Sequence, residues 1–126
     1  MTANNGAGLF TKQFVLGIII TLGAVNVSFT IQAADIAYGT LTGVKLYDFS
    51  NSKLIKVHFA ADATHKDEVS CNGVGTITYG QHEDAVINQM LSIAMAGYLS
   101  GVKLRAYAEH SGSCEIDLIT IQKTYF

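Results

Sequence analysis

The chain has 126 residues, 49% of them hydrophobic, with a formal net charge of −2, two cysteines and neither proline nor tryptophan. This composition indicates one globular domain and excludes a disordered tail. All ten acidic side chains and seven of the eight basic ones follow residue 34, and no segment of this part gathers positive charge. No nucleic-acid partner is expected, because phosphate neutralisation supplies most of the affinity of such proteins.

Residues 1–33 have the order of a secretory signal peptide. A polar start containing Lys12 precedes an apolar run from Phe14, and small residues end the segment at Ala33 and Ala34. We expect cleavage after Ala33, which leaves residues 34–126 as one exported domain without a stable membrane span. The alternative, an uncleaved anchor, is disfavoured because the interrupted apolar run spans about 16 residues, whereas a spanning helix needs about 20.

Alternation of apolar and polar residues predicts the first strand over 38–47, with a bulge where the pattern slips at Gly43. A turn over 48–52 and a second strand over 54–59 complete a hairpin. The residues expected on the buried face of the second strand are Ile55, Val57 and Phe59. The charged segment 60–70 is expected to be an exposed loop, and a third strand over 74–79 follows it.

Apolar residues at helical spacing predict an amphipathic helix over 83–100. Glu83 and Asp84 stand at its start, where the helix dipole favours acids, and Gly101 follows its end. Gly97 inside the helix points to close packing on the sheet. The residues expected to face the core are Ile87, Met90, Leu91, Ala94, Met95 and Tyr98.

A clean alternation predicts a strand over 102–109, and a second phase slip predicts a bulged last strand over 114–123. The residues expected to point inward from the first of these are Val102, Leu104, Ala106 and Ala108. Three strands, one helix and two strands predict a mainly β domain, a five-stranded antiparallel barrel of the OB-fold type with the helix across one end. The alternative is an open α+β sheet with one packed helix.

The two cysteines, Cys71 and Cys114, both lie in the exported part. An even number of cysteines in an oxidising compartment predicts a disulfide, here closing a loop of 43 residues. The alternative is a catalytic thiol with His110 as its base, but a bonded sulfur cannot attack a substrate.

Several segments resemble a group of small exported proteins of Gram-negative bacteria that are similar in layout to the B subunit of subtilase-type cytotoxin. They are Gly39-Thr-Leu-Thr-Gly43, Cys71, the helix 87–99 with Gly101-Val-Lys-Leu104, and Gly112-Ser-Cys114. The resemblance covers most of residues 38–122 and implies an OB-fold and a periplasmic or secreted location. For the toxin subunits it also implies a ring of five that binds cell-surface sugars, so a homo-oligomer stays open here. The sugar-contacting residues of the toxins have no position-by-position match in this chain, so only the fold is carried over.

The candidate binding residues are Lys103, Arg105 and Tyr107, which are expected to point outward from one strand, with Lys45 and Tyr47 from the first strand. Rings beside polar groups on the face of a barrel suit sugar or peptide binding, although an ordinary solvated strand face has the same composition. The four histidines do not match the spacing of a zinc site, so no metal or cofactor is expected.

No phosphate-binding loop or nucleophile elbow is present in the sequence, which argues against an enzyme. We therefore expect an exported, non-enzymatic module that binds a glycan or an envelope protein. The alternatives are a structural or stress-related periplasmic domain without a small ligand and, less favoured, a small hydrolase.

Overall fold

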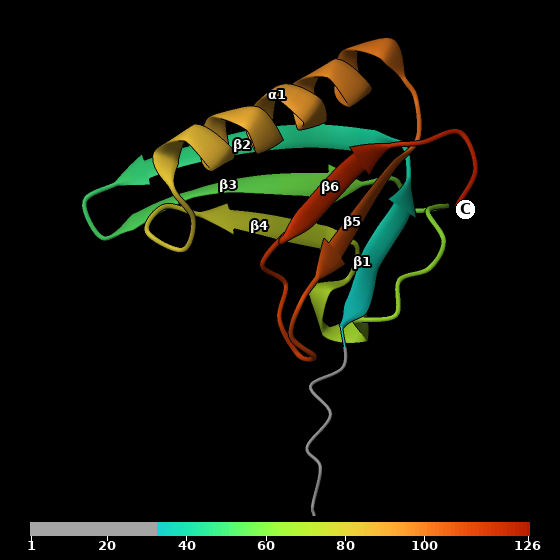
Figure 1. Ribbon diagram of the computed structural model, residues 1–126, viewed down its shortest axis with the longest axis horizontal. Helices are drawn as coiled ribbons and strands as arrows, with labels where there is room; N and C mark the ends of the chain where they lie inside the picture. Colours follow the sequence, from blue (N-terminus) through green and yellow to red (C-terminus); the bar gives the residue numbers. More distant parts are fainter. Residues whose placement is uncertain (1–32) are drawn as a thin grey trace, which may run out of the picture. The chain divides into compact units, whose positions relative to one another are not determined.

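A computed structural model describes residues 33–126 of the chain (Figure 1). The predicted signal peptide, apart from its last residue Ala33, lies outside the described residues. Four strands, one helix and two further strands follow in order, with a short 3-10 turn at Val69–Cys71 before the fourth strand. Within residues 33–126, no helix is both long enough and apolar enough to cross a membrane.

Six strands form two antiparallel sheets of three strands each (Figure 1). The first sheet has the order β1-β5-β6, with strands Ala34–Gly39, Leu104–Ala108 and Leu118–Ile121. The second has the order β2-β3-β4, with strands Leu41–Phe49, Ser52–Phe59 and Val74–Thr78. The helix α1, Asp84–Ser100, packs against both sheets through contacts with β2 and β6. The domain is thus mainly β with one helix, as expected.

The first predicted strand, 38–47, is in fact two strands that belong to different sheets. β1 pairs with β5 as far as Gly39, and β2 begins at Leu41 and pairs with β3. The predicted bulge is present, because the register of β2 against β3 shifts between Leu41 and Gly43. One continuous extended segment therefore serves both sheets, and the strand count rises from five to six.

The two sheets are not closed into the predicted five-stranded barrel. Besides the crossing of the chain between β1 and β2, a parallel bridge at Thr76 connects the two sheets. The Thr76 amide donates to the Cys114 carbonyl, and the Ile116 amide donates to the Thr76 carbonyl, both at 2.8 Å. This bridge does not extend into a ladder, because β6 begins only at Leu118. The alternative prediction, an open α+β arrangement with one packed helix, fits the structure.

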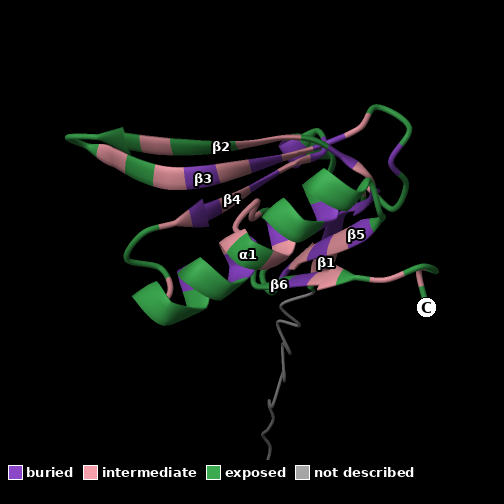
Figure 2. Ribbon diagram, turned by 90° about the horizontal axis from the view of Figure 1, so that it is seen from above, coloured by how far each residue is buried: buried purple, intermediate pink, exposed green. Residues whose placement is uncertain are grey.

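The core lies where the two sheets and the helix meet (Figure 2). The inward-facing residues predicted for β3 and β5, including Ile55, Val57 and Leu104, are buried as expected. The loop 60–70 is largely exposed, as predicted, but Thr64 exchanges two backbone hydrogen bonds with Tyr38 of β1, and Ala63 beside it is buried. Val102 was expected to point inward but is exposed, because β5 begins only at Leu104.

The helix buries a narrower stripe than its sequence suggested. Its buried residues are Ile87, Met90, Ala94 and Gly97. Met95 and Tyr98 were expected in the core but are 39% and 41% exposed. They stand one position beyond Ala94 and Gly97, which turns them about 100° away from the sheets. The helix ends at Gly101 in a left-handed conformation, as predicted.

Gly97 packs directly against Leu104 of β5. A Cβ at this position would clash with Cδ1 of Leu104 and lie 2.7 Å from its Cγ, and Leu104 is fully buried. We predict that Gly97→Ala lowers the free energy of unfolding by about 1–3 kcal/mol through overpacking. This loss should exceed the gain in helix propensity of up to about 1 kcal/mol.

Urea unfolding of Gly97→Ala beside Ser92→Ala measures this effect. Ser92 is exposed on the same helix, so its replacement should leave the stability unchanged or slightly raised. An unchanged stability in Gly97→Ala would show that the helix can shift away from β5 at little cost.

Candidate functional site

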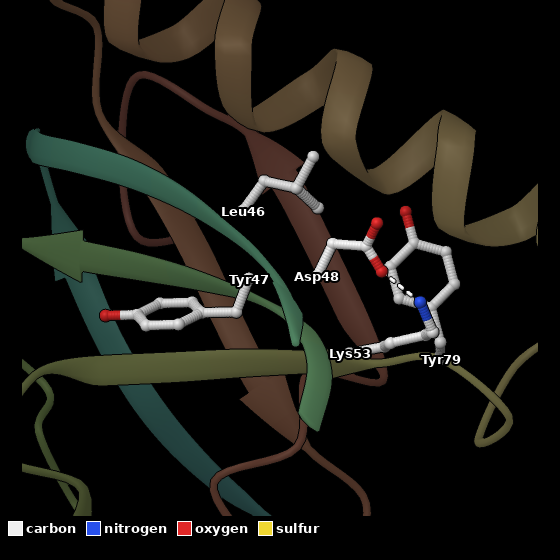
Figure 3. Close-up of a pocket in the computed structure, with 5 residues that line it drawn as sticks. All are labelled: Leu46, Tyr47, Asp48, Lys53 and Tyr79. Carbon is white, nitrogen blue, oxygen red and sulfur yellow. Dashed lines mark hydrogen bonds and ion pairs between the residues drawn. The ribbon is translucent and has the colours of Figure 1, made fainter. Parts of the chain in front are cut away.

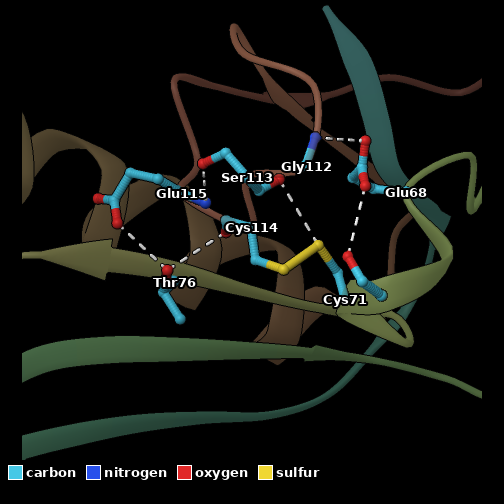
Figure 4. Close-up of a disulfide and its surroundings, with 8 residues drawn as sticks. Glu68, Cys71, Thr76, Gly112, Ser113, Cys114 and Glu115 are labelled. Carbon is cyan, nitrogen blue, oxygen red and sulfur yellow. Dashed lines mark hydrogen bonds between the residues drawn. A yellow bond between two sulfur atoms is a disulfide. The ribbon is translucent and has the colours of Figure 1, made fainter.

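The predicted disulfide between Cys71 and Cys114 is present (Figure 4). It joins the 3-10 turn before β4 to the segment that leads into β6, with the two Cα atoms 5.5 Å apart. Both cysteines of the chain are consumed in this bond, which excludes the alternative of a catalytic thiol.

Next to the disulfide, the carboxylate of Glu115 is held by donors from β4 and from the turn that follows it. The amide and hydroxyl of Thr78 donate to it at 2.7 and 2.6 Å, and the Thr76 hydroxyl donates at 3.2 Å. Nε2 of His82 lies 3.0 Å from the same carboxylate. These four partners match the number of lone pairs that a carboxylate offers. Glu115 therefore links the two sheets, and the fold itself takes up its hydrogen-bonding capacity.

Arg105, a candidate ligand-binding residue, is engaged within the fold. Its Nε donates to Oδ1 of Asp35 at 2.7 Å, and Asp35 is only 4% exposed. This hydrogen bond raises the pKa of Arg105 above its ordinary value, so the guanidinium stays charged. The rings of Tyr107, Tyr125 and Phe126 lie about the guanidinium, with their centroids 5.3, 4.9 and 4.8 Å from its central carbon.

Aromatic contacts fix the last residues of the chain to the sheet β1-β5-β6. The Tyr125 hydroxyl donates to the second oxygen of Asp35, a hydrogen bond that raises the pKa of Tyr125 above its ordinary value. The His65 ring stacks on Tyr125 with 3.6 Å between centroids, and Tyr38 meets both rings edge to face. Lys103 lies over the Tyr38 ring at 5.5 Å. The outer face of this sheet is thus covered by its own chain.

The five predicted binding residues fall into two sets on different sheets. Lys103, Arg105 and Tyr107 belong to β5 and the residue before it, whereas Lys45 and Tyr47 belong to β2. Tyr47 meets Phe49 edge to face at 5.9 Å and lies beneath the ammonium group of Lys56 at 5.4 Å. Within residues 33–126, no aromatic or cation–π contact joins one set to the other.

The end of the β2–β3 hairpin contains a cavity of about 240 Å³ (Figure 3). Its lining residues are Leu46, Tyr47, Asp48, Lys53 and Tyr79. Leu46 and Asp48 are two residues apart and so share one face of the strand. Lys53 is the register partner of Asp48 and forms an ion pair with it. Figure 3 shows the Tyr47 side chain pointing away from the other four.

Tyr79 enters this cavity because β4 ends beside the hairpin. Tyr79 follows directly after β4, and its amide donates to the Lys53 carbonyl at 3.1 Å. This hydrogen bond holds Tyr79 beside the hairpin. Leu46 and Phe49 near the tip are each 62% exposed. The hairpin therefore presents rings and an aliphatic side chain to solvent around a pair of opposite charges.

Of the five lining residues, only Tyr47 was predicted as a binding residue. The sequence did contain one indication of this site. Asp48 and Lys53 lie on either side of the predicted turn, and a hairpin brings such oppositely charged positions together. A second hollow, of about 290 Å³, contains one further predicted residue, Lys103. Its lining residues are Thr40, Gly101, Val102, Lys103, Ile121, Gln122 and Lys123.

Within the described residues, no group of three or more His, Cys, Asp or Glu side chains is arranged to hold a metal ion. Comparison with known proteins finds no matching family model, no matching curated protein and no matching solved structure.

His58 on β3 supplies a pH-dependent contribution to stability. Burial lowers the pKa of His58 below 6.5, and the neighbouring charges of Lys45 and Lys56 lower it further. Its Nε2 atom is buried without a hydrogen-bond partner. As the pH falls through 6.5, the unfolded chain takes up a proton at this ring that the folded chain does not, so stability falls with the pH.

We predict that His58→Gln reduces the loss of unfolding free energy between pH 7.5 and about pH 5.5, a window that lies on either side of the unfolded-state pKa. Urea unfolding of both proteins at the two pH values measures the difference. His110→Gln, at an exposed position, is the matched control. An equal loss of stability in the wild type and in His58→Gln would contradict the assignment.

Proposed function

We propose that this protein is an exported, non-enzymatic binding module that recognises one sugar residue of a glycan through the hairpin pocket. The observation that carries the proposal is the grouping of Tyr79, Leu46 and the Asp48–Lys53 ion pair around a hollow of about 240 Å³ (Figure 3). Exposed apolar side chains gathered at one site indicate a binding surface.

The chemistry of these side chains matches that of a sugar ring. The C–H face of a sugar can lie on the Tyr79 ring, and its hydroxyl groups can donate to the Asp48 carboxylate and accept from the Lys53 ammonium group. The pocket is smaller than the range of about 300–1,000 Å³ that is usual for small-molecule sites. It therefore favours a single sugar residue over an extended chain.

The location and the family are part of the same proposal. A disulfide persists in oxidising compartments, which supports a periplasmic or secreted protein of a Gram-negative bacterium. The chain crosses from one sheet to the other at Thr40, and the bridge at Thr76 joins them a second time. These two junctions support an opened version of the OB-fold layout, and with it the resemblance to toxin B subunits.

A glycan array probed with the protein, purified after export with its disulfide intact, tests the proposal. The free terminal monosaccharide of the best-bound glycan is then titrated by calorimetry, which removes any effect of multivalency. Tyr79→Ala should weaken this binding about tenfold, the equivalent of losing one aromatic contact. Tyr98→Ala removes a similarly exposed tyrosine from α1 and should leave the affinity unchanged.

Folded wild-type protein that binds no glycan on the array would overturn the proposal. A Tyr79→Ala variant that binds the sugar as tightly as the wild type would overturn the assignment of the pocket.

A further inference from the structure

The outward face of α1 lacks the charges that a solvated helix face normally carries. Among the 17 residues of the helix, only Asp84 at its start is charged. The exposed residues after it are Ala85, Val86, Asn88, Gln89, Ser92, Met95, Ala96, Tyr98, Leu99 and Ser100. This stretch of about 24 Å combines apolar and neutral polar groups. Depletion of charge together with exposed Met and Tyr is the composition of the centre of a protein–protein interface.

Charges of opposite sign stand at the two ends of this neutral face. Glu83 and Asp84 are exposed at the start of α1. Lys103 is exposed just beyond its end and lines the same hollow as Lys123, with its ammonium group over the Tyr38 ring at 5.5 Å. The helix is thus acidic at one end, neutral along its length and basic beyond the other end.

We infer that this face is a self-association surface, on which α1 of one copy packs antiparallel to α1 of a second copy about a two-fold axis. In such a dimer the same patch faces itself. A neutral patch meets its own copy without repulsion. The antiparallel direction sets Glu83 of each helix opposite Gly101 of the other copy, two residues before Lys103, whose exposed side chain can leave the Tyr38 ring to reach it. A parallel arrangement would bring the two acidic ends together, which the charges disfavour.

The shape of the face supports the same pairing. A shallow hollow of about 430 Å³ lies in the middle of the helix surface, lined by Asn88, Gln89, Ser92 and Ile93. The two-fold axis is expected to pass near Ser92, which lies in the middle of the exposed stretch. In this antiparallel register, Met95 of one copy stands opposite Gln89 of the other. The flexible Met95 side chain can then fill the hollow. Leu99, which is 76% exposed, stands opposite the small Ala85.

A contact limited to one helix face is short, so the dimer should dissociate on dilution within the micromolar range. Sedimentation velocity of the exported protein across that range measures this. Ser92→Glu places a charge against its own copy at the axis and should weaken the dimer at least tenfold. Ser92 is exposed, so circular dichroism should be unchanged. Val69→Glu introduces the same charge at an exposed position away from α1 and is the matched control.

A charge reversal tests the direction of the two helices. Glu83→Lys and Lys103→Glu should each weaken the dimer, and the two changes together should restore it. A monomer at every concentration, or a larger assembly that Ser92→Glu leaves intact, would overturn the proposal. A stable dimer in which the double reversal restores nothing would overturn the antiparallel arrangement. Calorimetric titration with a free sugar reports on the hairpin pocket alone, so the two proposals fail independently.

Discussion

Replacement of both Cys71 and Cys114 by alanine should lower the free energy of unfolding by about 4 kcal/mol, because a closed loop of 43 residues restricts the unfolded chain. The loop contains β4, α1 and β5, so the bond constrains most of the elements that build the core. Whole domains are stabilised by only about 5–15 kcal/mol, so the variant should be largely unfolded at moderate temperature. Urea unfolding followed by circular dichroism measures the loss.

Reductant provides the control for this prediction. Dithiothreitol should destabilise the wild type to nearly the level of the double alanine variant, and it should have no effect on that variant itself. A loss of less than about 1 kcal/mol in the double variant would mean that the Thr76 bridge and the Glu115 hydrogen bonds hold the two sheets together without the disulfide.

The second large effect is expected at Asp35. Asp35→Ala removes the partner of a largely buried guanidinium and leaves Arg105 uncompensated beneath Tyr125 and Phe126. Breaking one side of a buried ion pair costs about 3–5 kcal/mol. We expect the lower end of that range, because the Arg105 side chain keeps 14% of its surface exposed. Chemical unfolding of the variant and the wild type at neutral pH measures the cost.

Two further variants test whether the unpaired charge causes the loss of stability. Asp48→Ala breaks an ion pair whose side chains are largely exposed, and its stability should change by less than about 1 kcal/mol. The double variant Asp35→Leu with Arg105→Met leaves no unpaired charge and should recover most of the loss. If the double variant were no more stable than Asp35→Ala, packing around Asp35 rather than its charge would be the source of the effect.

The features that sequence reasoning located well depend on neighbouring residues. The alternation around Ile55 and Val57 specifies which side of β3 is buried, and Gly101 specifies where α1 stops. The disulfide followed from counting two cysteines in a chain with a predicted leader. In each case the physical cause lies in strand periodicity, in backbone conformation or in composition, all of which can be read locally.

The features that were missed depend on partners far along the chain. The same alternation continues through Thr40, so nothing local shows that β1 and β2 join different sheets. Arg105 points outward from β5 as expected, but its environment is set by Asp35, 70 residues earlier, and by the rings of Tyr125 and Phe126. The hairpin pocket depends on where β4 ends beside β2 and β3, and the strand pattern does not specify that position.

The pairing of β1 with β5 also determines when the domain can fold. Ala34, the first residue of β1, is the register partner of Ala108, near the far end of the chain. During synthesis, which begins at the amino terminus, β1 has no partner strand until β5 emerges, and Cys71 has no partner thiol until Cys114 follows. Contacts of such long sequence separation form slowly. The β2–β3 hairpin can therefore form early, whereas the sheet β1-β5-β6 and the disulfide form only after α1 and β5 are available.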